Sequence, residues 1–230
     1  MINRIMKKII SPEINYTPEY IHAIENRVSN FLEYSQLPKV FMQDGIDMEM
    51  APARLRQLYE NRDEIIESNG RCNQLIQLSD YRESGYITSA IIESYVVDCI
   101  KADKYIKPIL YIDTNLLLND YKRLIGISES PITYLQHDME ILNKEIFTAE
   151  FIFWDKFVLP TTSDYSQFQF SKLYDILSIR YRNCVGNMFF VNMPIERLPF
   201  NHEFWVMMNV DNKNILNFQN DSYKHLDRSN

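Results

Sequence analysis

The chain has 230 residues, of which 46% are hydrophobic and 24% are charged, with five Gly and nine Pro. This composition is typical of a folded globular protein, and it excludes a long disordered or fibrous chain. The net charge of −7 excludes a protein whose whole surface grips DNA, because sequence-independent affinity for DNA comes from Lys and Arg neutralising phosphates. Any contact with nucleic acid must therefore be a local basic patch.

Targeting and metal-binding signals are missing from the sequence. No apolar run approaches the roughly 18 residues of a membrane span, and the first ten residues lack the apolar stretch of a secretory signal. The three Cys are widely spaced, and the four His have no metal-ligand spacing. We therefore expect a soluble, cytoplasmic protein without metal or cofactor. The abundance of Ile, Asn, Lys and Tyr is typical of an AT-rich genome, such as that of a low-GC bacterium or its phage.

The first 70 residues predict a helical N-terminal region. A helix is expected from Thr17 to Tyr34, with Thr17 as its N-cap and Pro18 at its first helical position. A second helix is expected over 53–68, ended by the Asn-Gly pair that follows it.

Residues 71–230 predict a second region, in which strands alternate with helices. Short apolar runs separated by helices are typical of a parallel sheet covered on both faces. The fold class is thus α/β, with a doubly wound, mostly parallel sheet whose ligands would lie at the carboxyl ends of its strands. The expected strands are 74–78, 108–112, 150–154, 187–191 and 214–218, and the expected helices are 88–102, 115–124, 133–147 and 167–182.

In such a sheet, the loop after the first strand is where a phosphate-binding P-loop belongs. If Gly85 is its second glycine, Asp80 stands at the first glycine and Tyr86 replaces the Lys that binds phosphate. Thr88 is a displaced candidate for the hydroxyl that binds Mg²⁺. This loop, read as residues 79–90, therefore predicts a degenerate nucleotide site.

A second degenerate feature follows the third expected strand. The apolar run 151–154 is followed by Asp155 and Lys156, in the place where a P-loop ATPase carries acids that position Mg²⁺ and the attacking water. Asp155 keeps the first acid, whereas Lys156 replaces the second. The alternative is that Asp155 merely caps the end of a strand.

The segments 163–183 and 187–198 resemble a stretch of the DnaC/DnaI helicase-loader ATPases. In that family, a helix ending in Arg-Tyr-Asn precedes an apolar strand that closes with a sensor Asn. Here Arg180-Tyr181 with Asn183, and then Asn192, occupy those places. The resemblance extends back through 109–118 and the Leu-Pro pair at residues 37–38, and it covers about two thirds of the chain.

The resemblance implies a P-loop (AAA+-like) fold and a role in DNA replication. Because the P-loop residues and the second acid are missing, we expect no ATP hydrolysis. The leading hypothesis is an accessory protein that binds a replicative helicase and assists its loading on single-stranded DNA. Two alternatives stay open: an inhibitor or decoy that blocks the host helicase or its loader, and an ATPase with a displaced nucleotide site.

Two groups of residues combine cations with aromatic rings, as single-stranded DNA requires. The alternative is that they are ordinary solvated ends of helices, where cations favour the C-terminal dipole. The candidates are Tyr121, Lys122 and Arg123, and Arg180, Tyr181 and Arg182.

The helicase contact is expected on the first long helix, because an amphipathic helix can lay its apolar face in a partner's groove. The alternative is that this stripe packs on the protein's own sheet. The stripe consists of Ile21, Ile24, Val28 and Phe31.

Overall fold

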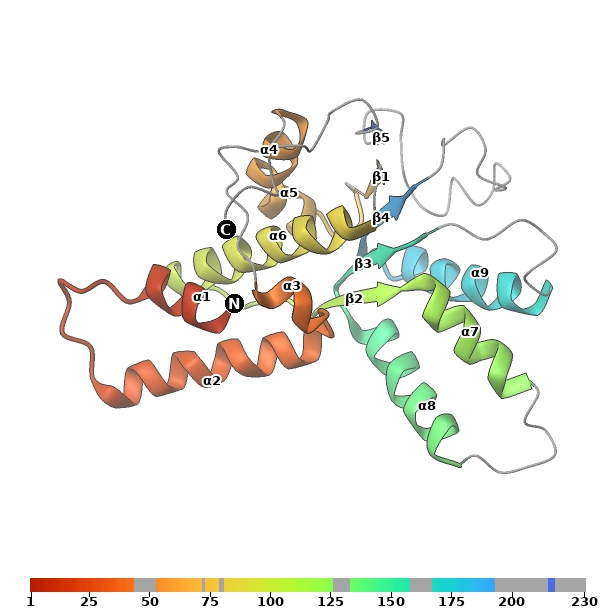
Figure 1. Ribbon diagram of the computed structural model, residues 1–230, viewed down its shortest axis with the longest axis horizontal. Helices are drawn as coiled ribbons and strands as arrows, with labels where there is room; N and C mark the ends of the chain where they lie inside the picture. Colours follow the sequence, from red (N-terminus) through yellow and green to blue (C-terminus); the bar gives the residue numbers. More distant parts are fainter. Residues whose placement is uncertain are drawn as a thin grey trace.

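The computed structural model describes residues 1–43, 53–71, 73–78, 81–125, 133–157, 167–192 and 215–217. In this part of the chain, five strands form one sheet in the order β2-β3-β4-β1-β5, and every neighbouring pair is parallel (Figure 1). The predicted α/β class and parallel sheet are confirmed. The strands are β1 (Gln74–Gln77), β2 (Ile109–Asp113), β3 (Phe151–Asp155), β4 (Gly186–Val191) and β5 (Ile215–Asn217).

Helices cover both faces of the sheet. The chain leaves β1 for the far edge at β2, returns through β3 and β4, and adds β5 on the other side of β1. Right-handed crossovers in opposite directions place their helices on opposite faces. None of the described helices is long and apolar enough to cross a membrane. The crossover helices are α6 (Tyr81–Lys101) on one face and α7 (Thr114–Ile125), α8 (Thr133–Thr148) and α9 (Gln167–Arg182) on the other.

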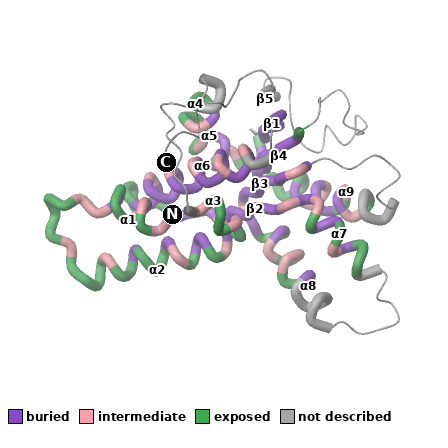
Figure 2. Tube along the Cα trace, in the orientation of Figure 1, coloured by how far each residue is buried: buried purple, intermediate pink, exposed green. Residues whose placement is uncertain are grey.

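Strands β1 to β4 are buried on both faces, as Figure 2 shows. Successive side chains point to opposite faces, so Phe153 packs in the cluster formed with α6, while Trp154 packs in the cluster formed with α7, α8 and α9. Both side chains are completely buried. This double burial is why the strands read in the sequence as continuous apolar runs.

Among the residues that the structure describes, five helices precede the sheet. The hydroxyl of Thr17 accepts a hydrogen bond from the backbone N–H of Tyr20 at 3.3 Å, which confirms the predicted N-cap. Two of these helices, α1 and α3, were not predicted, and the helix expected over 53–68 is interrupted at Asn61. The helices are α1 (Ile2–Ile9), α2 (Pro18–Ser35), α3 (Lys39–Gln43), α4 (Ala53–Glu60) and α5 (Arg62–Glu67).

The apolar stripe of α2 packs on the protein's own core. Ile24, Val28 and Phe31 are buried in the cluster that joins α2 to α6 and the sheet, and Ile21 is half-buried. The prediction that this stripe is a docking face for a helicase is therefore wrong, because its apolar area is already removed from water. The alternative, internal packing, is confirmed.

The carboxyl end of α2 lies across the edge strand β2. Most of α2 packs in the cluster on the α6 face, yet Tyr34 packs against the cluster on the opposite face. Nε2 of Gln36 donates to Oε2 of Glu145 in α8 at 2.5 Å. An uncovered edge strand invites pairing with other chains. Helix α2 thus protects the edge and joins the two layers.

Helix α1 is held to α6 by ion pairs. Glu93 of α6 accepts from Arg4 at 2.9 Å and from Lys8 at 2.8 Å. Burial alone would raise the pKa of Glu93, but the hydrogen bonds from Lys8 and Arg4 outweigh burial and lower it. The first helix is therefore part of the same body as the sheet.

Arg180 is buried at the amino end of the sheet. Its guanidinium donates to the carbonyls of Ile146 and Ala149 at 2.8 and 2.9 Å, to the carbonyl of Gly186 at 2.8 Å, and to Oδ1 of Asn187 at 2.7 Å. It therefore satisfies carbonyls at the end of α8 and joins them to β4. The prediction that Arg180 contacts DNA is wrong, because only 1% of its surface is exposed.

We expect Arg180→Lys to lower the free energy of unfolding by about 3 kcal/mol. A lysine ammonium is a single point of charge and cannot reach acceptors spread around a planar guanidinium, so buried carbonyls lose their partners. The matched control is Arg182→Lys, two residues along the same helix and exposed, which should change stability by less than about 0.5 kcal/mol. Urea unfolding followed by circular dichroism measures both, and equal effects would contradict the structural role of Arg180.

Candidate functional site

The carboxyl ends of the strands bring two acids together. Asp113 at the end of β2 and Asp155 at the end of β3 are register partners on neighbouring strands. The neighbouring strands β1 and β4 are followed in the chain by strands at opposite edges of the sheet, β2 and β5, and open parallel sheets bind ligands where the strand order reverses in this way. The candidate site therefore lies along the ends of β2, β3, β4 and β1.

The carboxylate of Asp155 is buried and surrounded by donors. Its Oδ1 accepts from Oγ of Ser84 at 2.6 Å and from the backbone N–H of Lys156 at 2.8 Å. Its Oδ2 accepts from the hydroxyl of Tyr111 at 2.5 Å. Burial raises the pKa of Asp155, while the hydrogen bonds from Ser84 and Tyr111 oppose that rise. Strand β2, strand β3 and helix α6 thus meet at this one carboxyl group.

Lys156 supplies an internal cation beside that carboxyl group. Its backbone is left-handed, with φ of 48°, and its Nζ lies 2.5 Å from Oδ2 of Asp113. Burial lowers the pKa of Lys156, but bonding to Asp113 outweighs burial and raises it. The other oxygen of Asp113 accepts from the backbone N–H groups of Asn115 and Leu116 at the start of α7. Each of the two acids is therefore already neutralised or hydrogen-bonded within the protein.

The expected phosphate-binding loop is largely helical. Helix α6 begins at Tyr81, seven residues before Thr88, so the expectation of a loop through Thr88 is wrong. Gly85, Tyr86 and Thr88 all lie in α6, and Asp80 lies outside the described residues.

The glycine that suggested a loop has a packing role. A Cβ at Gly85 would stand 2.2 Å from the ring of Phe41 in α3. The same ring lies edge-on to Tyr86, with centroids 5.6 Å apart. Gly85 is therefore kept small by a neighbouring aromatic ring, not by a bound phosphate.

The two remaining nucleotide-site candidates, Thr88 and Asn192, differ in their exposure. The side chain of Thr88 is fully buried, and its hydroxyl has no hydrogen-bond partner among the described residues. Asn192 is exposed just after β4. In the described part of the chain, no group of three or more His, Cys, Asp or Glu is arranged to hold a metal ion. A ligand at Asp155 would have to displace Ser84 or Tyr111.

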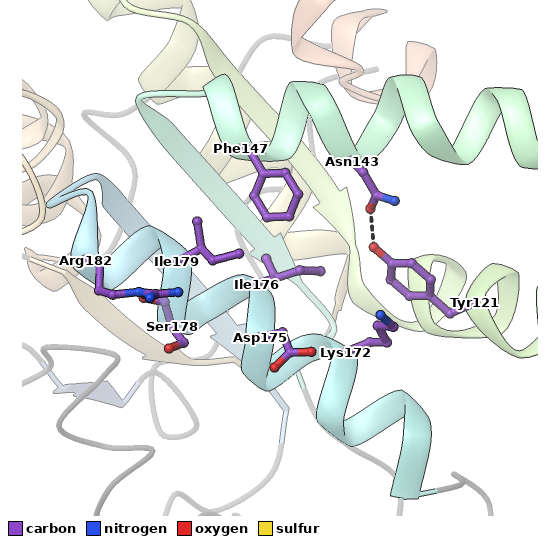
Figure 3. A pocket seen from close by; sticks show the side chains of 9 residues that line it. All are labelled: Tyr121, Asn143, Phe147, Lys172, Asp175, Ile176, Ser178, Ile179 and Arg182. Atoms are coloured by element: carbon purple, nitrogen blue, oxygen red, sulfur yellow. Dashed lines mark hydrogen bonds between the residues drawn. The ribbon is translucent and has the colours of Figure 1, made fainter.

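The fold separates the DNA-binding candidates into groove-lining, exposed and buried residues. Tyr121 of α7 and Arg182 of α9, taken from two separate groups in the sequence, line one groove of about 370 Å³ between α7, α8 and α9 (Figure 3). Lys122, Arg123 and Tyr181 are exposed, and Arg123 lies 3.4 Å from Asp120. The fold therefore brings one residue from each group to the same groove, whereas Arg180 is buried.

Sequence reasoning missed several residues that define these sites. Ser84 and Tyr111 hold Asp155, yet the first lay in the expected loop and the second inside an apolar strand. Phe147 and Lys172 line the groove with Tyr121. One signal was available in the sequence: two apolar strands that each end in Asp. Parallel pairing of β2 with β3 places these two residues, Asp113 and Asp155, side by side.

Removing one donor to Asp155 should destabilise the fold. We expect Tyr111→Phe to cost about 1–3 kcal/mol at neutral pH, because a buried carboxylate loses a hydrogen bond that water cannot replace. The control is Tyr20→Phe, since Tyr20 is half exposed and its ring stacking on Tyr16 is kept. Chemical denaturation measures both variants. An unchanged free energy of unfolding in Tyr111→Phe would show that the hydroxyl of Tyr111 does not stabilise the carboxyl group of Asp155.

The raised pKa of Asp155 predicts a pH-dependent stability difference between wild type and Asp155→Asn. The pKa of Asp155 in the folded protein lies above the unfolded value of about 3.9. The protonated carboxyl group therefore contributes fully to the free energy of unfolding below about pH 3.9, and this contribution is lost as the pH rises through the folded pKa. The free energy of unfolding of wild type minus that of the variant should therefore fall as the pH is raised above about 4. Urea titrations across this range test it, and a difference that grows with pH would mean that the folded protein favours the carboxylate.

Comparisons with known proteins do not identify the chain. No protein-family model matches it. A comparison with curated proteins finds no significant match. The functional assignment therefore depends on the geometry of the site and on the sequence resemblance.

Proposed function

We propose that this chain is a DNA-replication accessory protein that binds a replicative helicase, or the helicase's loader, and assists helicase loading on single-stranded DNA without hydrolysing ATP. Its frame is of the P-loop (AAA+-like) type, with a helical extension at the N-terminus. The resemblance of 163–183 and 187–198 to the DnaC/DnaI loaders supports both the partner and the frame. The position of β1 beside the switch point, followed by α6, is consistent with that frame.

One observation carries the non-hydrolytic part of the proposal: the carboxylate of Asp155 is engaged by Ser84, Tyr111 and the backbone of Lys156. In a P-loop ATPase, an acid at this position holds Mg²⁺ and a hydroxyl completes the metal site. Here a serine hydroxyl donates directly to the acid. A lysine ammonium takes the place of the second acid and would oppose a bound Mg²⁺.

The partner contact is assigned away from the stripe of α2. That stripe is occupied by the protein's own core, so a helicase must bind another surface. The proposal therefore predicts that the helicase binds while α2 remains packed on the protein's own core.

Calorimetry and helicase capture test the proposal. Titration with ATP and Mg²⁺ should release no heat of binding, and phosphate release should equal that of Asp155→Ala. Purified replicative helicase should be captured equally with and without ATP, because no metal-bound phosphate contributes to the complex. Helicase-dependent unwinding of forked DNA should rise when the protein is added.

The other outcomes separate the alternatives. Helicase capture with blocked unwinding would identify an inhibitor or decoy and overturn the loading role. ATP turnover that Asp155→Ala abolishes would establish a displaced nucleotide site and overturn the non-hydrolytic role. Failure to capture either the helicase or its loader would overturn the choice of partner.

A further inference from the structure

The groove between α7, α8 and α9 has a regular arrangement of charge. On α9, Lys172, Asp175 and Arg182 share one face, since they are separated by three and seven residues. The two cations are ten residues apart, or about 15 Å along the helix axis. Their order along the groove is positive, negative, positive, which places the negative side chain between two positive ends (Figure 3).

An aromatic ring forms the opposite wall. Phe147 of α8 is 37% exposed and faces the groove, where Ile176 and Ile179 of α9 complete an apolar floor (Figure 3). The hydroxyl of Tyr121 donates to Oδ1 of Asn143, which fixes the position of that amide at the end of the groove. An exposed phenylalanine in a groove that two cations also line supplies a flat face on which a planar ligand can stack.

The size of the groove limits its occupant. Its volume of about 370 Å³ lies near the lower end of the range of ligand pockets, about 300–1,000 Å³. A stable protein partner would need about 800 Å² of surface on each side. The groove therefore suits a unit the size of one nucleotide better than a helix from another protein.

We propose that this groove binds one nucleotide unit of a single-stranded nucleic acid, with the base stacked on Phe147 and the flanking phosphates held by Lys172 and Arg182. The carboxylate of Asp175 repels phosphate from the middle of the groove and accepts a hydrogen bond from an amino group of the base. Sequence-tolerant binding of single strands combines the same two elements, an aromatic platform and cations along the backbone. The inference deepens the proposed function, which requires single-stranded DNA near the helicase.

DNA binding by the purified full chain, without helicase, tests this inference. Fluorescence anisotropy with a labelled 12-nucleotide single strand of mixed sequence at low salt should show saturable binding. Phe147→Ala should weaken the affinity about tenfold, and Phe147→Tyr should restore it because the stacking face returns. Lys172→Ala and Arg182→Ala should each reduce the steepness of the salt dependence by about 0.7, as expected for one phosphate contact on a single strand.

Matched controls remove one exposed cation elsewhere. Lys101→Ala on α6 and Arg71→Ala after α5 change the net charge equally but lie outside the groove, so the affinity and the salt dependence should stay as in wild type. Unfolding curves of all variants establish that each remains folded before its affinity is compared.

Three results would overturn the inference. The first is absence of binding by folded wild-type protein at low salt. The second is equal loss of affinity in the groove variants and in the two controls, which would indicate non-specific attraction. The third is unchanged DNA affinity in groove variants that lose helicase capture, which would make the groove a protein-docking surface. Because the measurement uses no helicase, failure to capture a helicase would leave the inference standing.

Discussion

The buried carboxyl group of Asp155 is the constraint on which the rest of the site depends. It lies at the end of β3, accepts from Tyr111 in β2 and from Ser84 in α6, and is followed by a residue with left-handed backbone. A buried carboxyl group is costly unless it is hydrogen-bonded. The position of the first turns of α6 and the direction taken by Lys156 therefore follow from the need to satisfy this one group.

The N-terminal helices stabilise the fold through their packing on the sheet and on α6. Helix α2 crosses the edge strand and contacts both layers, and α3 carries the ring that lies on Gly85. Helix α1 is attached to α6 through Glu93. On the opposite face, α7, α8 and α9 enclose a groove that is open to macromolecular contacts.

The order and type of the sheet elements could be predicted from sequence because periodicity and burial agree. The predicted bounds of α9 match the structure, and the five strand predictions differ from it by at most one residue at either end. Gly85 led to the wrong start for α6, because a glycine that accommodates an aromatic ring looks the same in sequence as one that turns a loop. Arg180 was misread for a similar reason: nothing local distinguishes a guanidinium that caps buried carbonyls from one that faces solvent. Both depend on residues distant in the chain.

The packing of Phe41 on Gly85 also bears on how such a protein can evolve. Any larger residue at position 85 would collide with the ring, and a smaller residue at position 41 would leave a void against α6. The side chains at positions 41 and 85 therefore constrain each other, because a larger residue at position 85 needs a smaller one at position 41. Such mutual dependence predicts that these two positions change together in any relatives of this chain.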